Sequence, residues 1–441
     1  MKNPPAVTAS QIACDPPYHR VTRRLVPLLF AGYLAAYLDR VNVGFAKLQM
    51  LVDLRFSDTV YGLGAGIFFV GYFLLEVPSN LMLHRFGARV WIARIMILWS
   101  LISAATMFVT TPAQFYCARF LLGAAEAGFF PGIIFYLTCW YPAKLRAQIT
   151  AYFVSAIGLA GIVGGPLSGW IMQAFAGRSG LAGWQWLFLL EAIPSLLMGF
   201  IVLRWLPAGI EQADWLTATE KQQLRAAVDA EIRDQHRLPL RSVLLHVRVW
   251  SLGCIYFTLM IGLYGISFWT PQLIRNTGVQ TMLGVGLISA IPYMVAVGVM
   301  TAVSRYSDRT GRRHRPVVWC FSAGALGFGL MALAGQNTGL VMTGLILATA
   351  GVLGAMPLFW TFPATFLGGA AAAAGIALIN SLGNLGGFVG PSLTGLLNDL
   401  TGTPVSGLHA MAGCLLVGTL LTGCLLSPPT VSLQRGKGKW S

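Results

Sequence analysis

Charged residues are scarce in this 441-residue chain. They make up 10% of the sequence, against about 25% in ordinary soluble domains. Hydrophobic residues make up 56%, and no long soluble domain separates the apolar segments. A helix that crosses a membrane needs about 20 mainly apolar residues. The composition therefore argues against a soluble globular protein and predicts a chain that crosses a membrane many times.

The patterns that mark metal centres and hydrolases are also missing. The seven cysteines are scattered, and their odd number argues against a full disulfide framework. The six histidines form no His-Glu-x-x-His pair, and no Gly-x-Ser-x-Gly run occurs. We therefore expect no metal and no cofactor, and we disfavour an intramembrane enzyme. A channel is disfavoured too, because it would need rings of equivalent groups.

The apolar segments predict an all-α membrane protein with twelve transmembrane helices. A polar stretch in the middle of the chain separates two groups of six segments. The predicted helices cover residues 25–50, 60–83, 89–110, 113–138, 147–173, 185–206, 249–274, 282–304, 315–335, 339–366, 373–398 and 406–427.

The same reading divides the chain into five parts. Two six-helix bundles at 25–206 and 249–427 flank a connector at 207–248, and short tails cover 1–24 and 428–441. Within the connector, Thr217 is followed three residues later by Glu220, which is a capping-box pattern and predicts the start of a helix.

The net charge of +15 resides mostly in short loops. Of the 30 basic residues, six lie inside predicted helices or at the face opposite the termini, and subtracting these six from 30 leaves 24 on the side of both termini. The six are Arg40, Arg119, Lys47, Arg55, Arg178 and Arg275. By the positive-inside rule both termini are cytoplasmic, which predicts a multi-pass protein of the inner (plasma) membrane and no nucleic-acid partner.

Internal repeats relate the two groups of helices. Gly87, in the run 85–89, and Gly311, in the run 309–313, are 224 residues apart. Pro166 and Pro391 lie in similar Gly-rich runs and are 225 residues apart. Two pseudo-symmetric halves of this kind hold a transported substrate between them near the membrane midplane.

These features resemble the major facilitator superfamily. Several motifs, in order along nearly the whole chain, are similar to those of its anion:cation symporter family; they occupy residues 37–42, 76–80, 119–123, 126–128, 130–132 and 184–188. The resemblance implies a major facilitator fold and proton-coupled uptake of a small organic anion by alternating access. It also implies gating roles for loop residues between helices, namely Arg85, Gly87, Arg89, Asp308, Arg309, Gly311 and Arg312.

Ionisable residues within the predicted spans all belong to the first half. They are Asp39, Arg40, Glu76, Arg119, Glu126 and Glu191. An ionisable side chain at this depth is costly, so each is a candidate functional residue with a partner. Arg119 and Glu126 are seven residues apart, so they share one face of a helix. If a substrate carboxylate takes over an arginine, the protein carboxylate loses its partner and binds a proton more readily. Permanent ion pairs that lock two helices together are the alternative.

Roles for these residues follow from the resemblance. Asp39 and Glu126 match proton-carrying positions, Arg40 matches an arginine that meets the substrate carboxylate, and Arg119 matches a second arginine. Tyr72 matches a substrate-contact position.

The second half contributes candidates through the repeat and through spacing. The 224-residue offset maps Arg40 onto Tyr264, which we expect to face the same cavity. Asn380 and Asn384 are one helical turn apart and can donate hydrogen bonds to a substrate. Hydrogen bonds between helices are the alternative role for both amides.

The expected partners are a small organic anion, protons and the lipid bilayer, and the protein is expected to act as a monomer. Sugar acids, hydroxydicarboxylates and aromatic carboxylates all fit an arginine in a polar and aromatic cavity. An exchanger or a facilitator without proton coupling is the alternative function.

Overall fold

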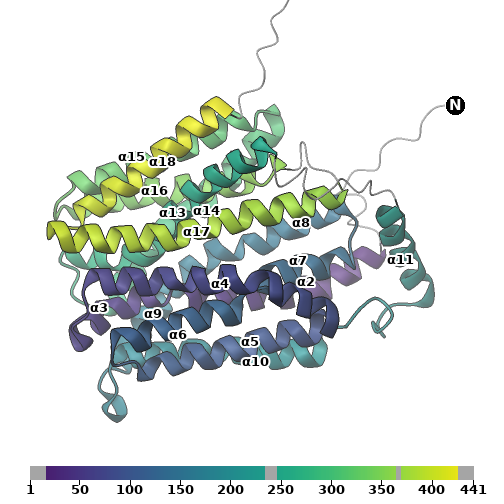
Figure 1. Cartoon of the computed structure of the whole chain (residues 1–441), viewed down its shortest axis with the longest axis horizontal. Helices are drawn as coiled ribbons and strands as arrows, with labels where there is room; N and C mark the ends of the chain where they lie inside the picture. The colour runs from purple at the N-terminus through teal and green to yellow at the C-terminus, as the bar shows by residue number, and fades with distance from the viewer. Residues whose placement is uncertain (1–15, 234–245, 364–368, 426–441) are drawn as a thin grey trace, which may run out of the picture.

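The structure is a computed structural model that describes residues 16–233, 246–363 and 369–425 (Figure 1). Within these ranges every regular element is a helix. In chain order the first half contains α2 Pro16–Val41, α3 Val43–Leu54, α4 Asp58–Phe86, α5 Ala88–Ala105, η1 Thr106–Phe108, α6 Pro112–Glu126, α7 Phe129–Thr138, α8 Ala143–Val154, α9 Ala156–Ala174, η2 Arg178–Gly180 and α10 Gly183–Trp205. After α11 Ala218–Arg233 come α13 Val247–Asn276, α14 Met282–Thr310, α15 His314–Leu333, α16 Thr338–Phe359, α17 Gly369–Thr401 and α18 Val405–Leu425.

Most of these helices are long and apolar enough to cross a membrane. Ten spans in the described residues meet that criterion, and α17 and the α2–α3 pair pack among them. Large apolar side chains such as Leu333, Leu400 and Leu420 are exposed on the outside of the bundle. Because such side chains favour lipid over water, the surface fits an all-α membrane protein.

The helices form two groups that lie side by side (Figure 1). Helices α2 to α10 make up one group and α13 to α18 the other, while α11 lies apart at one end. The groups meet chiefly where α4 packs on α17 and where α9 packs on α14. The interface between the two groups therefore lies along these two contacts.

The first helix begins earlier than the sequence predicted. Residues 16–24 belong to α2 rather than to the expected tail 1–24, of which 1–15 lie outside the described residues. Proline is well tolerated in the first turn of a helix, where its missing N–H would have no partner. Contacts with Tyr141 hold the added turns at residues 16–24 in place. The ring centres of Tyr18 and Tyr141 lie 6.2 Å apart in a stacked arrangement, and the Thr22 hydroxyl lies 3.1 Å from the Tyr141 hydroxyl.

The predicted helix 113–138 is broken into α6 and α7. The break follows Glu126, with Ala127 outside the helical region and Gly128 at φ +85°. A Cβ on Gly128 would lie 2.3 Å from the Ser79 hydroxyl oxygen, so a larger residue fits neither the backbone nor the space. The break makes Glu126 the last residue of α6.

The internal repeat has a structural counterpart. Gly87 and Gly311 end α4 and α14 with positive φ angles of 81° and 67°. Both helices run past their predicted ends, so Arg85, Asp308 and Arg309 lie on final helical turns rather than in loops. A glycine is favoured at each end because other residues rarely adopt this conformation.

The repeat also governs how the two halves touch. A Cβ on Gly62 would lie 2.4 Å from the Pro391 carbonyl oxygen, and one on Gly286 would lie 2.2 Å from the Gly165 carbonyl oxygen. Gly62 and Gly286 are 224 residues apart. Small residues allow helix backbones to approach closely in membranes. The two contacts are therefore pseudo-symmetric copies that hold the halves together at the end where α4 begins and α17 ends.

The capping box predicted in the connector is confirmed. The Thr217 backbone N–H donates to Glu220 Oε2 at 2.9 Å, and the Glu220 N–H donates to Thr217 Oγ1 at 3.3 Å. Helix α11 begins at the next residue after Thr217. Residues 234–245 of the connector and the tail 428–441 lie outside the described residues.

Candidate functional site

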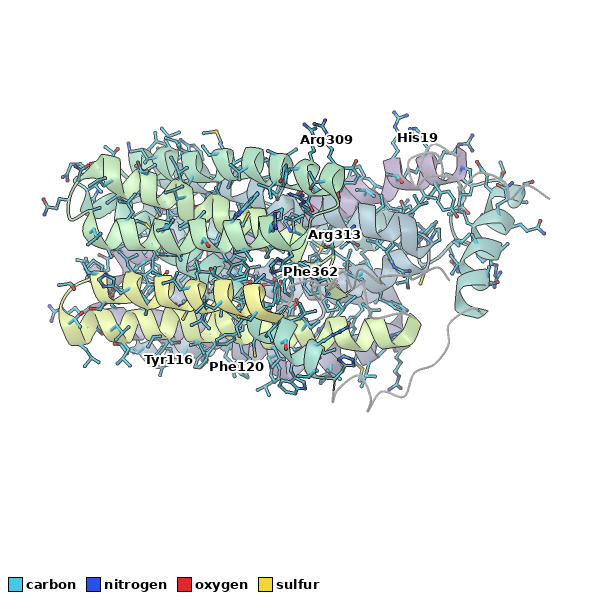
Figure 2. All side chains as sticks on the ribbon, turned by 90° about the horizontal axis from the view of Figure 1, so that it is seen from above. His19, Tyr116, Phe120, Arg309, Arg313 and Phe362 are labelled. Atoms are coloured by element: carbon cyan, nitrogen blue, oxygen red, sulfur yellow. The ribbon has the colours of Figure 1, made fainter. Side chains whose placement is uncertain are left out.

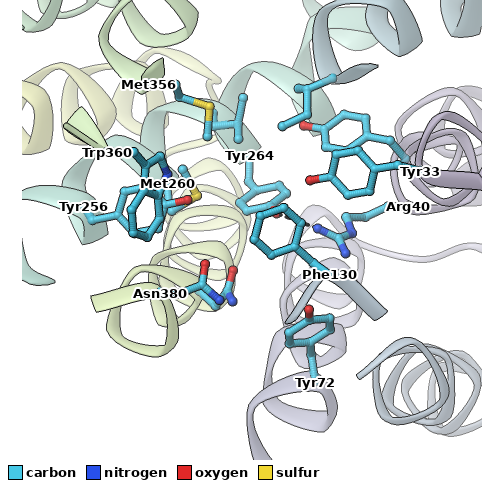
Figure 3. Close-up of a pocket in the computed structure, with 14 residues that line it drawn as sticks. Tyr33, Arg40, Tyr72, Phe130, Tyr256, Met260, Tyr264, Met356, Trp360 and Asn380 are labelled. Atoms are coloured by element: carbon cyan, nitrogen blue, oxygen red, sulfur yellow. Dashed lines mark hydrogen bonds between the residues drawn. The ribbon is translucent and has the colours of Figure 1, made fainter. Parts of the chain in front are cut away.

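A cavity lies between the two halves, with side chains from both in its wall (Figure 3). Its space, including the part open to solvent, is about 540 Å³. One charged side chain, two amides, four aliphatic side chains and seven aromatic side chains line it: Arg40, Asn380, Asn384, Ile157, Met260, Leu263, Met356, Tyr33, Tyr37, Tyr72, Phe130, Tyr256, Tyr264 and Trp360.

Arg40 joins the two halves at this cavity. It lies near the end of α2, and its Nη2 forms an ion pair with Glu126 Oε1 from α6. Its Nη1 donates to the Tyr264 hydroxyl of α13 at 3.0 Å. The guanidinium also lies over the rings of Phe68 at 5.3 Å and Tyr72 at 5.6 Å, which favours a cation. Arg40 therefore contacts a carboxylate of its own half and a hydroxyl of the other half.

Glu126 is positioned by the helix break. Its side chain is buried and extends from the last position of α6 toward α2. The sequence placed Glu126 and Arg119 on one helix face and kept an ion pair between two helices as the alternative for Glu126; in the structure Glu126 forms such a pair with Arg40 of α2. The spacing of seven residues aligns two side chains on a face, whereas contact across the bundle depends on the neighbouring helix.

Asp39 faces away from Arg40. It accepts hydrogen bonds from Trp99 Nε1 at 3.1 Å and Ser103 Oγ at 3.0 Å on α5, and from Ser195 Oγ on α10. Among the described residues the ion pair considered for Asp39 is not formed, because these three partners are neutral. Neighbouring residues on a helix point about 100° apart. This angle between Asp39 and Arg40 places Asp39 inside the first bundle and outside the cavity wall.

Arg119 is also outside the cavity wall. It is completely buried on α6, its Nε donates to the Gly64 carbonyl at 3.4 Å, and it lies over the Phe68 ring at 5.1 Å. Its two terminal nitrogens have no hydrogen-bond acceptor among the described residues. The Phe68 ring lies within reach of both Arg119 and Arg40, so the two arginines share one aromatic neighbour.

The remaining predicted substrate contacts lie in the cavity wall. Tyr72, Tyr264, Asn380 and Asn384 all line it, as Figure 3 shows for three of them by label. Asn380 Nδ2 also donates to Glu76 Oε1 at 3.4 Å, so this amide takes part in an interhelical hydrogen bond as well.

Several aromatic residues of the wall were missed from the sequence. Tyr33 lies two helical turns before Arg40, and Tyr256 lies about two turns before Tyr264, so both share a helix face with a predicted site residue. Tyr256 stacks on Phe359 at 4.9 Å. The same-face spacing was the signal that could have identified both tyrosines.

Two further buried carboxylates have partners of their own. Glu76 Oε2 accepts from Ser381 Oγ at 3.3 Å, in addition to the Asn380 contact, and so joins α4 to α17. Glu191 Oε1 accepts from Ser168 Oγ at 2.6 Å and joins α10 to α9 within the first half.

Lys47 was expected at the membrane face opposite the termini and is instead completely buried. Its Nζ lies 2.9 Å from Asp58 Oδ1 and 3.5 Å from the Trp269 ring centre, so α3 contacts both α4 and α13 of the second half. Asp399 at the end of α17 accepts from the Thr59 N–H at 2.8 Å. We call Lys47, Asp58, Trp269 and Asp399 the outer cluster.

The predicted gating residues form no ion pair with one another in the part of the chain that the structure describes. The Arg85 guanidinium lies 5.7 Å from the ring of its neighbour Phe86. Arg309 projects outward beyond the ribbon, as does His19 of α2 (Figure 2).

Comparison with known proteins identifies the class. The family model described as the Major Facilitator Superfamily matches residues 29–391. The chain belongs to this superfamily and is a multi-pass membrane transporter rather than an enzyme.

Relatives cover nearly the whole chain. The "Putative metabolite transport protein NicT" of Pseudomonas putida is 50% identical over 92% of this chain and 93% of its own length. A "Putative tartrate transporter" of Agrobacterium vitis is 47% identical over 91% and 90%. These relatives agree with the resemblance to organic-anion transporters of the superfamily.

Solved structures agree on the fold. The xylose transporter XylE from Escherichia coli, in a partially occluded inward-open conformation, superposes with a TM-score of 0.75 at 13% identity and covers 95% of this chain and 99% of its own. A bacterial homologue of the human lysosomal transporter Spinster gives a TM-score of 0.73 at 14% identity, with 92% and 96% covered.

Proposed function

We propose that this transporter takes a small organic anion into the cell together with protons, by alternating access across the inner membrane. The single observation that carries the proposal is the placement of Arg40, which is buried at the cavity between an ionisable partner, Glu126, and a hydroxyl of the other half, Tyr264. Relatives named as tartrate transporters support an organic anion as the cargo.

Coupling follows from competition for Arg40. A guanidinium pairs well with a cargo carboxylate through two parallel hydrogen bonds. When the cargo binds, Glu126 loses its cation in a site of low dielectric, where an unpaired carboxylate is costly. Glu126 then takes up a proton, so cargo and proton occupy the protein together. Proton release from Glu126 restores the ion pair and expels the cargo.

Asp39 supplies a second proton site in this proposal. It is buried among neutral donors, and no cation contacts it in the part of the chain that the structure describes, so its charge depends on three hydrogen bonds to α5 and α10. Binding of a proton to Asp39 replaces an acceptor by a donor and forces Trp99 and the two serines to rearrange. The position of α2 relative to α5 and α10 would change with protonation.

The direction of opening follows from the contacts between halves. The Gly62–Pro391 and Gly286–Gly165 contacts lie at one end of the bundle, with the outer cluster. With the termini in the cytoplasm, that end faces outward, and the cavity in this state opens inward.

The proposed inner gate includes Arg85, Arg89, Asp308 and Arg312. Asp308→Asn should then change the fraction of molecules in the inward-open state, which distances between spin labels measure.

Uptake by proteoliposomes tests the proposal. We expect an acidic exterior to drive accumulation of a labelled organic anion, and an imposed membrane potential to add about 2.3 kcal/mol per 100 mV for each net charge moved. Exchange of anion across the membrane with no response to a proton gradient would favour an exchanger or a facilitator.

The proposed orientation has its own test. Cysteines introduced at Lys221 and Arg178 should be labelled from opposite sides of the membrane, and labelling of both from the same side would contradict the orientation.

A further inference from the structure

The charges around the cavity are distributed unequally. Arg40 is the one charged side chain in the described wall, and it lies on the α2 side. The opposite side is formed by aromatic, aliphatic and amide side chains from α13, α16 and α17. The buried cations Lys47 and Arg119 do not line this space in the described structure. A second carboxylate on a cargo would therefore face a wall without a cation, at a high cost of desolvation.

The amide of Asn380 has a preferred orientation in this wall. Its Nδ2 donates to Glu76 Oε1 at 3.4 Å, while Glu76 Oε2 accepts from Ser381 at 3.3 Å. A carboxylate oxygen accepts and an amide nitrogen donates, so Glu76 holds the nitrogen of Asn380 on its own side. Figure 3 shows the Asn380 amide oxygen on the side of the cavity that holds Tyr256 and Trp360. That oxygen is left to accept a hydrogen bond.

From these two observations we infer that the cargo is a monocarboxylate with a neutral hydrogen-bond donor at its far end, and that Glu76 is the residue that positions Asn380 to accept from this donor. The inference rests on the proposed function, because it assigns Arg40 to the single carboxylate. The aromatic wall accommodates a flat body between the two ends. Specificity arises from attraction at one end and from an uncompensated charge that excludes dicarboxylates at the other. The cargo would then differ from the dicarboxylate tartrate for which two relatives are named.

Binding of five anions to the purified full-length protein tests the inference by calorimetry at neutral pH. Two pairs compare a monocarboxylate that has a terminal hydroxyl with the corresponding dicarboxylate: 4-hydroxybenzoate with terephthalate, and gluconate with glucarate. The fifth anion, benzoate, is 4-hydroxybenzoate without the hydroxyl. We expect the monocarboxylate of at least one pair to bind, and its dicarboxylate to bind at least about tenfold more weakly. 4-Hydroxybenzoate should bind about tenfold more tightly than benzoate, the ratio that one hydrogen bond supplies.

Variants separate positioning from a structural role of Glu76. In Glu76→Gln the side-chain amide can either donate to Asn380 or accept from it, so it no longer holds the Asn380 amide in one orientation. The ratio of the binding affinities for 4-hydroxybenzoate and benzoate should therefore fall toward one. Asn380→Leu should abolish the same ratio. Ser381→Ala is the matched control, because it removes the other hydrogen bond to Glu76 and leaves the Asn380 contact intact. It should keep the ratio.

The outcomes are distinguishable from failure of the proposed function. If terephthalate or glucarate binds as tightly as its monocarboxylate, or if Glu76→Gln keeps the ratio seen in the unmodified protein, the inference is overturned while organic-anion binding stands. If none of the five anions binds, the inference is overturned, and the response of anion uptake to a proton gradient in proteoliposomes decides the proposed function separately.

Discussion

At the scale of single residues, the adjacent pair Asp39 and Arg40 divides two tasks. The rotation of about 100° between adjacent helix positions sends Arg40 to the cavity and Asp39 into the first bundle. The two environments are different, because Arg40 contacts a carboxylate and a hydroxyl while Asp39 contacts three neutral donors. Substitutions at the two positions should therefore produce different defects.

Arg40→Lys should weaken cargo binding by at least about tenfold, because it loses one charged hydrogen bond worth about 1.5–3 kcal/mol. Lysine keeps the charge but not the planar fork that holds two carboxylate oxygens. Titration calorimetry with the bound anion measures the change. An unchanged dissociation constant would remove Arg40 from cargo recognition.

Asp39→Asn should spare exchange of anion across the membrane and abolish proton-driven accumulation. Asparagine keeps the size of the side chain but cannot gain or lose the proton. Counterflow and accumulation in proteoliposomes are the paired measurements, and Ser195→Ala serves as a control that removes one donor to Asp39 and keeps the carboxyl. Accumulation by Asp39→Asn against a gradient would rule out Asp39 as a proton carrier.

At the scale of elements, helix ends and helix contacts determine where the site residues lie. The break after Glu126 ends α6 beside Arg40, and glycines allow α4 to touch α17 and α14 to touch α9. The connector helix α11 is attached more simply, since Glu220 pairs with Arg20 of α2 at 3.1 Å. The glycine contacts and the start of α11 can each be tested by substitution.

Gly62→Ala and Gly286→Ala should disfavour the state closed at the outer end. Each added methyl would lie under 3 Å from a backbone carbonyl oxygen of the other half, which cannot rotate away. We expect a lower Tm and faster labelling of outer-end cysteines. Gly298→Ala on α14 is the matched control, because its methyl would meet no atom within 4 Å. Equal behaviour of all three variants would show that close packing does not hold this state.

The N-terminus of α11 should depend on pH. The Thr217 backbone N–H, its hydroxyl and Arg20 hold the pKa of Glu220 below its usual value of about 4.3. A lowered pKa in the folded helix adds stability above the usual value, and this stability is lost as pH falls through the folded pKa. Amide hydrogen exchange of α11, corrected for intrinsic rates, should rise at acidic pH. Glu220→Gln should show no such rise, and a rise equal to that of the unmodified protein would refute the assignment.

At the scale of the whole molecule, two halves close around a cavity and are joined at the outer cluster. Burial of the charged Lys47 side chain costs desolvation free energy, and its contacts with Asp58 and Trp269 offset this cost. Both contacts link α3 to neighbouring helices, and Trp269 belongs to the second half. Separation of the halves would remove the Trp269 ring from Lys47 and leave it the more distant ring of Tyr61 on α4, which lies at 4.8 Å.

Lys47→Met should therefore shift the protein toward a state open at the outer end. Methionine fills the apolar space but loses the ion pair and the cation–π contact. Spin labels at Ala176 and Gln280, both exposed, report the outer distance between the halves. We expect a longer distance for Lys47→Met and little change for Lys47→Arg, which keeps the charge. Identical distance distributions for Lys47→Met and the unmodified protein would show that the outer cluster does not control closure.

The sequence by itself determined the membrane class, the repeat and part of the site. Apolar runs of about 20 residues predict spans because a bilayer demands them, and the 224-residue offset alone placed Tyr264 opposite Arg40, where the two hydrogen-bond. The capping box at Thr217 was equally readable, because its partners are three residues apart.

Only the tertiary structure decided which charged groups meet. Helical spacing relates side chains within one helix, but the rotation of a helix against its neighbours is set by packing of the whole bundle. For that reason Glu126 pairs with Arg40 rather than with Arg119, and Asp39 faces α5 and α10. Lys47 was expected at the membrane face opposite the termini, because one of its aromatic partners, Trp269, is 222 positions away in the other half and no spacing rule relates the two residues.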